Sequence, residues 1–329
     1  MKKVLATASM IGLMATAAYA ETVDLKMSHV RPQGATIDVE LNAYAEAVRE
    51  ATAGDINIKI FPASALGDYT TVQERISVGA VDMATQPATS GVDRRMQIAS
   101  FPFIASDWGD ARRIYGPGGV ISKTMSNLYA EQDITMLAVY PVYFGGIALN
   151  REAISPGTTE EKGIKVRVPG VKSFQLNGEA LGYIPAPIPF SEAFTSVQTG
   201  VVDGVIGSGA EGYYASFRDV TKSYIAANTH FEVWFMIINT DVLNGLDEED
   251  QEALKAAALA FETQRWETAQ SDQTKNENRL TEELGTAVIR PTAEQLAAMA
   301  AKSREIVWPA VLEDVGAQWG QAILDEALN

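Results

Sequence analysis

The sequence predicts a two-lobed α/β protein, in which each lobe is a mixed, mostly parallel sheet flanked by helices and a long helix spans both lobes. Three observations predict this fold class. Strand-like and helix-like patterns alternate along the first half of the chain and again along the second. The segment "ISVGAVDM" at 76–83 is echoed by "VQTGVVDG" at 197–204, which indicates two similar lobes. Finally, no proline or glycine interrupts residues 246–284, which predicts the long helix.

The elements of the first half follow a βαβαβ order. The stretch "TVDLKMS" at 22–28 alternates as a strand, and apolar residues then recur at helical spacing from Ile37 to Val48. A second strand, "DINIKIF", is followed by a short helix from Tyr69 that Gly79 ends. The stretch "AVDMA" at 80–84 completes the order as a third strand, which is typical of a mostly parallel sheet.

The second half repeats this order. In "GIKVRVPG" at 163–170 the apolar residues alternate with Lys165 and Arg167, so the sequence predicts a strand whose Arg167 points away from its apolar face. A helix at 174–181, the extended "YIPAPIP", a helix at 191–199 and the strand "VVDGVI" follow.

The C-terminal part is predicted to be helical. Asp247 is a suitable cap for the long helix, which at 1.5 Å per residue would extend about 50 Å, enough to lie across two lobes. Thr292 is expected to cap a further helix, and Pro309 is expected to break the C-terminal helical region in two.

The first twenty residues resemble an export signal rather than part of the fold. Lys2 and Lys3 precede an apolar stretch that is too short to span a bilayer, and Ala18-Tyr19-Ala20 supplies the small residues of a cleavage site before Glu21. Removing this segment takes away two lysines and no acidic residue, so the net charge of −16 becomes −18. Such a polyanion is a poor partner for nucleic acid, and an anionic ligand would need a local positive site.

Catalytic and metal-binding motifs are scarce. The chain has no cysteine and two histidines, His29 and His230, which nearly excludes a zinc site and limits any serine triad to those two imidazoles. G-x-S-x-G, G-x-x-x-x-G-K and H-E-x-x-H are all missing from the sequence. We therefore expect no enzymatic activity, no cofactor and no metal.

Several polar and aromatic residues follow predicted strands, where α/β sheets place their clefts. Phe190 lies at a strand-to-helix junction, and His29 follows the first strand. The glycine-rich "GSGAEG" at 207–212 is expected to line a cleft with Ser208 or Glu211. Further candidates are the wall-forming aromatics Tyr143 and Trp234 and the hydrogen-bonding residue Gln86.

The motifs "FPASALGD", "GAVDMA", "GIKVRVP" and "PIPFSEAFTSVQTGVVDG", with a long helix after "WFMIIN", together resemble the periplasmic solute receptors of TRAP transporters, the DctP-like binding proteins. The likeness covers the chain from Glu21 onward. It implies a type II-like, two-lobed periplasmic binding protein with a signal peptide at 1–20. Lobe I would comprise 21–142 plus 235–272, and lobe II 143–234 plus 273–329.

The resemblance also implies a function and a site. A monomeric receptor would bind a small organic anion between its lobes and deliver it to small and large membrane subunits driven by an ion gradient. The arginine of the "R-V-P" strand, here Arg167, would form a two-pronged salt bridge with the ligand's carboxylate, and the aromatic residue of "P-F-S-E", Phe190, would pack on the ligand. Glycine at 145 and 146, and "VIGS" at 205–208, depart from the polar residues of some relatives and favour a small monocarboxylate.

Other hypotheses remain open from the sequence. A receptor of an ATP-driven (ABC-type) transporter shares the two-lobed design but does not predict the long helix. A sensory receptor that presents its ligand to a membrane kinase has the same sequence features as a transport receptor. From a different class, a periplasmic hydrolase would use His29 or His230 as its base.

Overall fold

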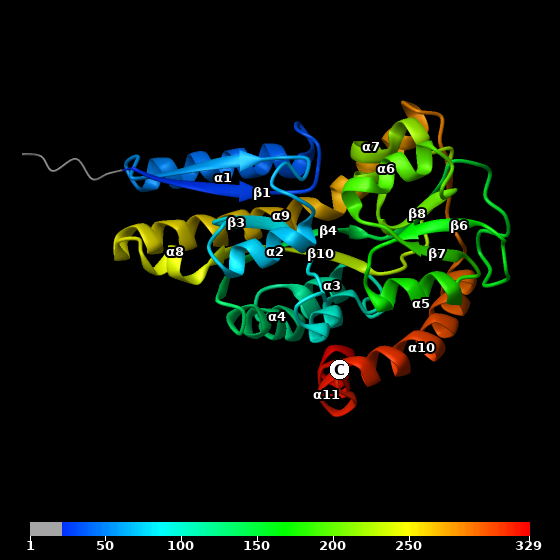
Figure 1. Ribbon diagram of the computed structural model, residues 1–329. Coiled ribbons are helices and arrows are strands. Elements are labelled where there is room, and N and C mark those ends of the chain that lie inside the picture. The colour runs from blue at the N-terminus through cyan, green and yellow to red at the C-terminus, as the bar shows by residue number, and fades with distance from the viewer. Residues whose placement is uncertain (1–21) are drawn as a thin grey trace, which may run out of the picture.

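Two mixed sheets form the framework of the protein, which was analysed as a computed structural model that describes residues 22–329. The predicted signal segment, residues 1–20, lies outside the described residues. Figure 1 shows the two sheets side by side, each with helices on its faces. This arrangement confirms the predicted fold class.

The first sheet has the strand order β2-β1-β3-β10-β4. Strand β1 pairs in parallel with β2 and β3, whereas β10 pairs in antiparallel fashion with β3 and β4. The strands are β1 (Val23–Ser28), β2 (Ile56–Phe61), β3 (Met83–Gln86), β4 (Ile134–Phe144) and β10 (Phe231–Asn239). The helical segments that accompany them are α1 (Thr36–Ala51), α2 (Tyr69–Ser77), the 3₁₀ segment η1 (Arg94–Ser100), α3 (Trp108–Tyr115), α4 (Val120–Ala130) and α8 (Thr240–Asn244).

The second sheet has the order β11-β9-β5-β8-β6-β7. Strand β6 is parallel to both β7 and β8, and β5 is antiparallel to β8 and β9. The strands are β5 (Gly146–Leu149), β6 (Lys165–Val168), β7 (Ile184–Pro187), β8 (Gly204–Ser208), β9 (Ser223–Ile225) and β11 (Ala287–Ile289). Around them lie α5 (Lys172–Ala180), α6 (Phe190–Gln198), α7 (Ala210–Phe217) and the 3₁₀ turn η2 (Arg218–Val220).

The echoed segments of the sequence occupy equivalent places. Helix α2 turns into the connection to β3 at Gly79, whose φ is +70°, and α6 turns toward β8 at Gly200, whose φ is +76°. Both angles lie in the left-handed region that favours glycine. The short repeat therefore marks the same helix-to-strand turn in each sheet.

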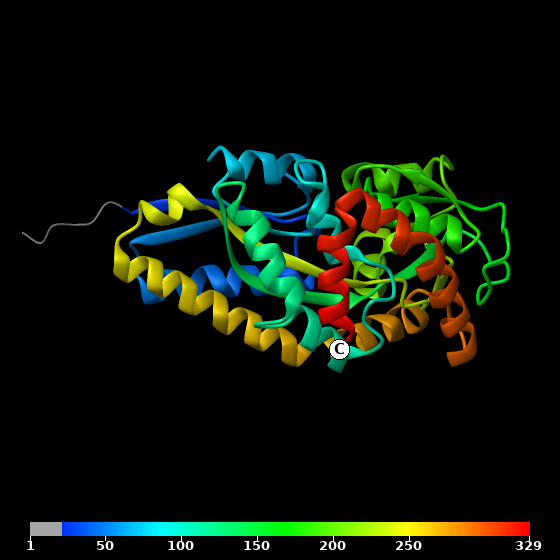
Figure 2. The ribbon, with the colours of Figure 1, turned by 90° about the horizontal axis from the view of Figure 1, so that it is seen from below.

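Helix α9 (Glu248–Glu282) is the predicted long helix, and its 35 residues run along the molecule (Figure 2). It packs against α1 and β4 of the first sheet and against α7 and β11 of the second. Asp247 precedes its first turn but makes no side-chain cap hydrogen bond. Among residues 22–329, no helix combines the length and the apolar character that crossing a membrane requires.

The C-terminal helices differ from the sequence prediction at one point. Thr292 and Gln295 form the capping box that begins α10 (Ala293–Val315), but this helix continues through Pro309. Proline costs one backbone hydrogen bond while its fixed φ stays helical, and the buried Val307 and Val311 anchor the helix on either side. The break comes instead at Gly316, whose φ is +97°, before α11 (Ala317–Leu328).

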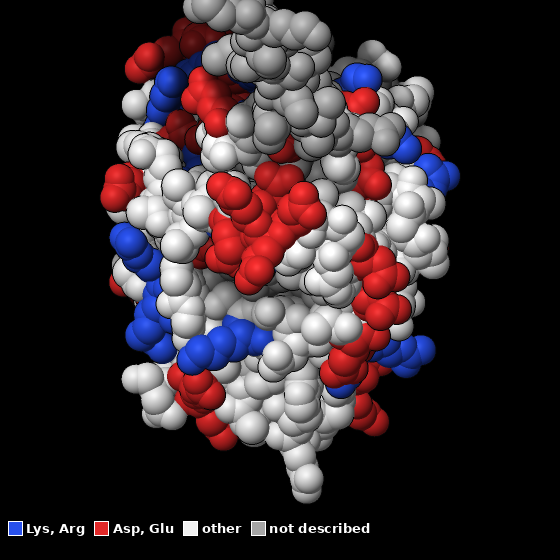
Figure 3. Space-filling view, turned by 90° about the vertical axis from the view of Figure 1, so that its left-hand side faces the viewer, with Lys and Arg blue, Asp and Glu red and all other residues white. Residues whose placement is uncertain are grey.

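Acidic side chains gather on the end of the molecule where α9 begins (Figure 3). Its first turn carries Glu248, Glu249 and Asp250, which the positive end of a helix dipole favours. Burial and the repulsion of neighbouring carboxylates raise the pKa of Asp250. Part of the negative charge of the chain is thus displayed on this end of the molecule.

Candidate ligand-binding pocket

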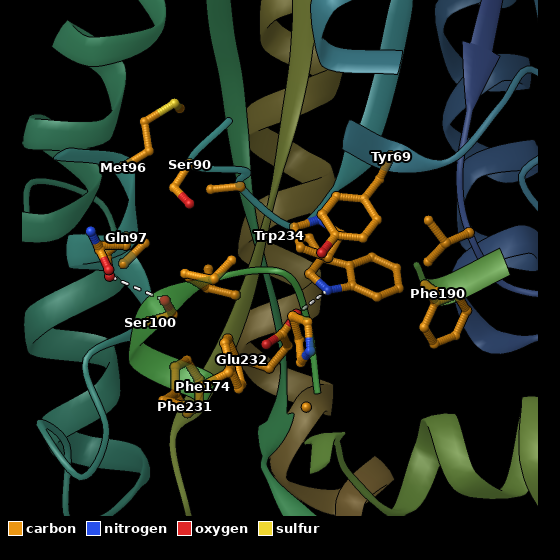
Figure 4. A pocket seen from close by; sticks show the side chains of 18 of the residues that line it. Tyr69, Ser90, Met96, Gln97, Ser100, Phe174, Phe190, Phe231, Glu232 and Trp234 are labelled. Atoms are coloured by element: carbon orange, nitrogen blue, oxygen red, sulfur yellow. Dashed lines mark hydrogen bonds between the residues drawn. The ribbon is translucent and has the colours of Figure 1, made fainter. Parts of the chain in front are cut away.

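A pocket lies where the two sheets meet (Figure 4). The space between its walls is about 660 Å³, which includes open solvent at its mouth. Its lining comes from the ends of β1, β4, β6 and β8, from β10, from η1 and the segment that precedes it, and from the first residues of α2, α5 and α6. Strands from both sheets therefore direct side chains into one cavity.

Arg167 enters this pocket from β6. Arg167 lies on the face opposite the valines, as the alternation predicted, and this face is covered at Arg167, which is only 1% exposed. Its Nε donates to the carbonyl oxygen of Ile188 at 2.8 Å, and its guanidinium lies 5.6 Å from the Phe190 ring centroid.

The charge of Arg167 has no acidic partner in the described part of the chain, since no carboxylate oxygen lies within 4.0 Å of its nitrogens. Burial lowers the pKa of this guanidinium, an effect that the nearby tyrosines and Asp68 oppose. An arginine nevertheless stays protonated in proteins. The pocket therefore contains a buried cation whose counter-charge residues 22–329 do not provide.

Arg31 is a second buried arginine in the pocket, and the sequence analysis did not identify it. It is 1% exposed, and its Nε donates to Glu211 Oε2 at 3.0 Å. Its Nη2 donates to the hydroxyl oxygens of Tyr143 and Ser208, both at 3.3 Å. Burial alone would lower the pKa of Arg31, but Glu211 and Tyr143 together outweigh burial and the pKa is raised.

The surroundings of Arg31 explain the sequence "GSGAEG". A side chain at Gly212 would collide with the Ser208 hydroxyl and the Arg31 guanidinium, and one at Gly209 would collide with the Tyr143 ring. The glycines make room for an ion pair between the loop after β1 and helix α7. Arg31 could have been predicted by the argument that selected His29, because it follows the same strand.

Phe190, Tyr143 and Trp234 are three further predicted residues that line the pocket. The Phe190 ring contacts both arginines, with the Arg31 guanidinium 5.3 Å from its centroid. The Trp234 ring lies 4.9 Å from the same guanidinium. Aromatic faces attract buried guanidinium groups, so these rings help to hold both cations in place.

The other four predicted residues do not line this pocket. His29 is fully buried, and its Nε2 lies 3.1 Å from Asp38 Oδ1; burial lowers its pKa, although Asp38 opposes the effect. Gln86 donates through Nε2 to the carbonyl oxygen of Tyr69 at 2.8 Å. Ser208 and Glu211 both bind Arg31.

Glu232 is a pocket residue that the sequence analysis also missed. It lies on β10, where every residue is buried. Its Oε2 lies 3.0 Å from His230 Nε2, and its Oε1 accepts from Trp234 Nε1 at 2.7 Å. The signal for it was a single glutamate within the otherwise apolar and aromatic "FEVWFMII".

Residues 27–313 match the family model DctP, described as bacterial extracellular solute-binding protein, family 7. The chain belongs to this family. A solute-binding protein of Roseobacter denitrificans is 28% identical over 272 residues, which cover 80% of this chain and 81% of that protein. The C4-dicarboxylate-binding periplasmic protein DctP of Rhodobacter capsulatus is 25% identical over 315 residues, covering 88% of this chain and 93% of that protein.

The fold of this DctP-family protein also matches solved structures. A TRAP periplasmic solute-binding protein from Desulfovibrio salexigens, crystallised with bound orotic acid, aligns with a TM-score of 0.83 at 21% identity, covering 92% of this chain and 97% of that chain. The protein thus has the two-lobed fold of TRAP solute receptors, as the resemblance implied.

Membership of this solute-binding family sets aside the hydrolase and ABC-type hypotheses, because its members are TRAP solute receptors and not enzymes. The positions of the two histidines also argue against the hydrolase hypothesis, which required one of them as a base. His230 is buried with Thr229 Oγ1 2.9 Å from its Nδ1 and Glu232 on its Nε2. Neither His230 nor His29 lines the pocket. Within residues 22–329, no group of three or more His, Asp or Glu side chains is placed to hold a metal ion.

Proposed function

We propose that this solute-binding protein holds a small organic anion, a carboxylate, in the pocket between its sheets, with Arg167 as the anchor. Phe190, Tyr143 and Trp234 would form the walls. The observation that supports this most is the position of Arg167, which is a buried guanidinium at the pocket wall without an acidic partner among the described residues.

The energetics favour an anionic guest at this position. A buried charge without a partner is costly, and the cost is recovered when an opposite charge with matching hydrogen-bond geometry enters the site. A guanidinium offers parallel N–H donors that suit the two oxygens of a carboxylate. Because Nε of Arg167 is already used by Ile188, the terminal nitrogens are the donors left for the ligand.

The ligands of two relatives support the same ligand class. The Rhodobacter capsulatus relative binds C4-dicarboxylates, and the Desulfovibrio salexigens structure contains orotic acid, also a carboxylic acid. Because the Rhodobacter capsulatus relative is a periplasmic protein, we also propose that the first twenty residues direct export of this protein to the periplasm. There it would act as a monomer that delivers its ligand to the small and large membrane subunits of a TRAP transporter.

A thermal-shift screen of the purified protein tests this function. Monocarboxylates, dicarboxylates, amino acids, sugar acids and neutral sugars would be added singly. At a concentration 100 times its Kd, a ligand stabilises the protein by about 2.7 kcal/mol, which is a readily measured increase in Tm. We expect a carboxylate to give this increase, and Arg167→Met to abolish it.

Arg151→Met is the matched control, because Arg151 is half exposed and lies 3.8 Å from Asp203, outside the pocket lining. This variant should respond like the wild type. Neutral sugars that stabilise the protein as strongly as acids, or an undiminished response of Arg167→Met, would contradict the proposal.

A further inference from the structure

Glu232 places a carboxylate in the same pocket as Arg167. Its side chain is on β10, and the residue is 8% exposed, so it is buried but in contact with the cavity. Figure 4 shows it beside Trp234, to which it is hydrogen-bonded. A carboxylate in this place would repel a simple monocarboxylate ligand, so its presence requires an explanation.

Both groups that donate to Glu232 can be neutral. Trp234 Nε1–H is an uncharged donor. His230 can donate through Nε2–H while its Nδ1 accepts from the Thr229 hydroxyl, which satisfies both nitrogens of a neutral imidazole. In the described part of the chain no lysine or arginine nitrogen lies within 4.0 Å of Glu232. Each carboxylate oxygen therefore keeps acceptor capacity for a further donor.

In the described part of the pocket, one buried arginine has no acidic partner and one buried glutamate has no lysine or arginine partner. Arg31 is paired with Glu211, which leaves Arg167 and Glu232; the basic neighbour of Glu232 is the His230 imidazole, a neutral donor in the arrangement above. The Tyr69 phenol lines the pocket, and burial raises its pKa to about 12. Arg167 lowers this pKa and Glu232 raises it, so both residues act on the same phenol. The two charges thus face the same cavity without forming an ion pair with each other.

A second acceptor lies on the η1 side of the pocket. Gln97 Nε2 donates to Asp314 Oδ2 at 2.8 Å, which fixes the orientation of the amide. The other atom of that amide, Oε1, is buried and has no hydrogen-bond partner among residues 22–329. Gln97 lines the pocket, and a buried acceptor of this kind is stabilised by a donor.

From these positions we infer that the pocket selects a zwitterion, a carboxylate that also carries a protonated amine, whose N–H groups are accepted by Glu232. This rests on the proposed function, because Arg167 must hold the carboxylate of the same molecule. A zwitterion neutralises both unpaired charges, whereas a monocarboxylate neutralises one and is repelled by the other. A further donor on the ligand would satisfy Gln97.

Matched pairs of probes test this inference on the wild-type protein. Each pair consists of an amino acid and the acid of the same skeleton without the amine: L-proline and cyclopentanecarboxylate, L-leucine and 4-methylpentanoate, L-phenylalanine and 3-phenylpropanoate. Isothermal titration calorimetry would measure Kd for each. We expect the amine-bearing member of a binding pair to bind about 10- to 100-fold more tightly, as for a hydrogen bond between charged groups.

Glu232→Gln identifies the residue responsible. The amide keeps the side chain's shape and can still hydrogen-bond Trp234 and His230, but it removes the charge. The preference within a pair should fall to about threefold or less, and the affinity for the acid without the amine should not decrease. Gln97→Met should weaken binding several-fold only for ligands that carry a further donor. The comparison of pairs in the wild type needs no variant, so it stays decisive even if Glu232→Gln folds poorly.

The outcomes separate this inference from the proposed function. If the acids without an amine bind as well as their partners or better, and Arg167→Met abolishes that binding, the zwitterion inference is overturned and the proposed function stands. An amine preference that persists in Glu232→Gln would overturn the role of Glu232. If no carboxylate of any kind binds, both proposals fail.

Discussion

Arg31 and Arg167 are two buried arginines in one pocket that differ in how their charge is compensated. Each is 1% exposed, and each guanidinium lies within 6 Å of the Phe190 ring centroid. Arg31 is bound by Glu211, Tyr143 and Ser208, whereas Arg167 has a carbonyl oxygen as its hydrogen-bond partner. The comparison teaches that burial alone does not indicate a ligand site. A buried charge without a counter-charge among the described residues does indicate one.

Replacing Arg167 should have the largest effect on binding. Arg167→Met removes the ligand's counter-charge, so affinity for the carboxylate should fall about 100- to 1,000-fold, as when one partner of a buried charge pair is truncated. The unfolding midpoint of the ligand-free protein in urea should stay the same or rise, because a buried unpaired charge is removed. A large loss of stability with unchanged affinity would show that Arg167 is structural.

Replacing Glu211, the partner of Arg31, should lower the stability of the ligand-free protein, which is the opposite of the effect expected for Arg167→Met. Glu211→Gln leaves Arg31 buried without a counter-charge, which should destabilise the ligand-free protein by about 3–5 kcal/mol. Urea unfolding measures this loss. The control is Glu46→Gln, which breaks an exposed pair with Arg49 and should leave the midpoint nearly unchanged. Equal effects of the two variants would remove the distinction between Arg31 and Arg167.

The two arginines share a contact with the ring of Phe190, and a substitution at Phe190 tests the contribution of that contact. Phe190→Leu removes a ring that contacts both guanidinium groups, at a cost of about 0.5–2 kcal/mol in ligand binding. Affinity should therefore fall roughly 3- to 30-fold by calorimetry. Phe194→Leu, on the same helix α6 but outside the pocket lining, should bind like the wild type. A similar loss in both variants would assign the effect to helix packing.

His29 is a buried basic group of a third kind. Unlike the two arginines, it can be buried in its neutral form. Burial lowers the pKa of His29 below its ordinary value near 6.5. As pH falls below about 6.5 the unfolded chain takes up a proton that the folded chain refuses, so stability should decrease by at most ~1.4 kcal/mol per pH unit from this group. The pH dependence of the urea midpoint should be shallower in His29→Gln, and an unchanged slope would contradict this account.

The sequence was informative where a residue's role follows from local periodicity. Alternation in "GIKVRVPG" located β6, and the uninterrupted run after Leu246 located α9. The cap at Thr292 was also predicted, because a cap depends on residues that are close in sequence. Pro309 was misjudged because buried valines on both sides hold α10 together, and such tertiary packing has no local signature.

The pocket was only partly predictable, because charge compensation depends on residues far apart in the chain. Arg167, Phe190, Tyr143 and Trp234 were expected at the cleft, and they line the pocket. Glu211 was expected to face a ligand, but its carboxylate is hydrogen-bonded to Arg31, which is 180 residues away in the chain. Glu232 was overlooked because its strand is otherwise apolar and aromatic, although a lone acid in such a strand is itself a signal.

The most direct test of the central claim compares a bound acid with its primary amide in the wild type and in Arg167→Met. If Arg167 holds the carboxylate, the wild type should bind the acid about 100-fold more tightly than the amide, because only the acid compensates the buried charge. In Arg167→Met that difference should disappear. A preference for the acid that is equally strong in both proteins would contradict the account.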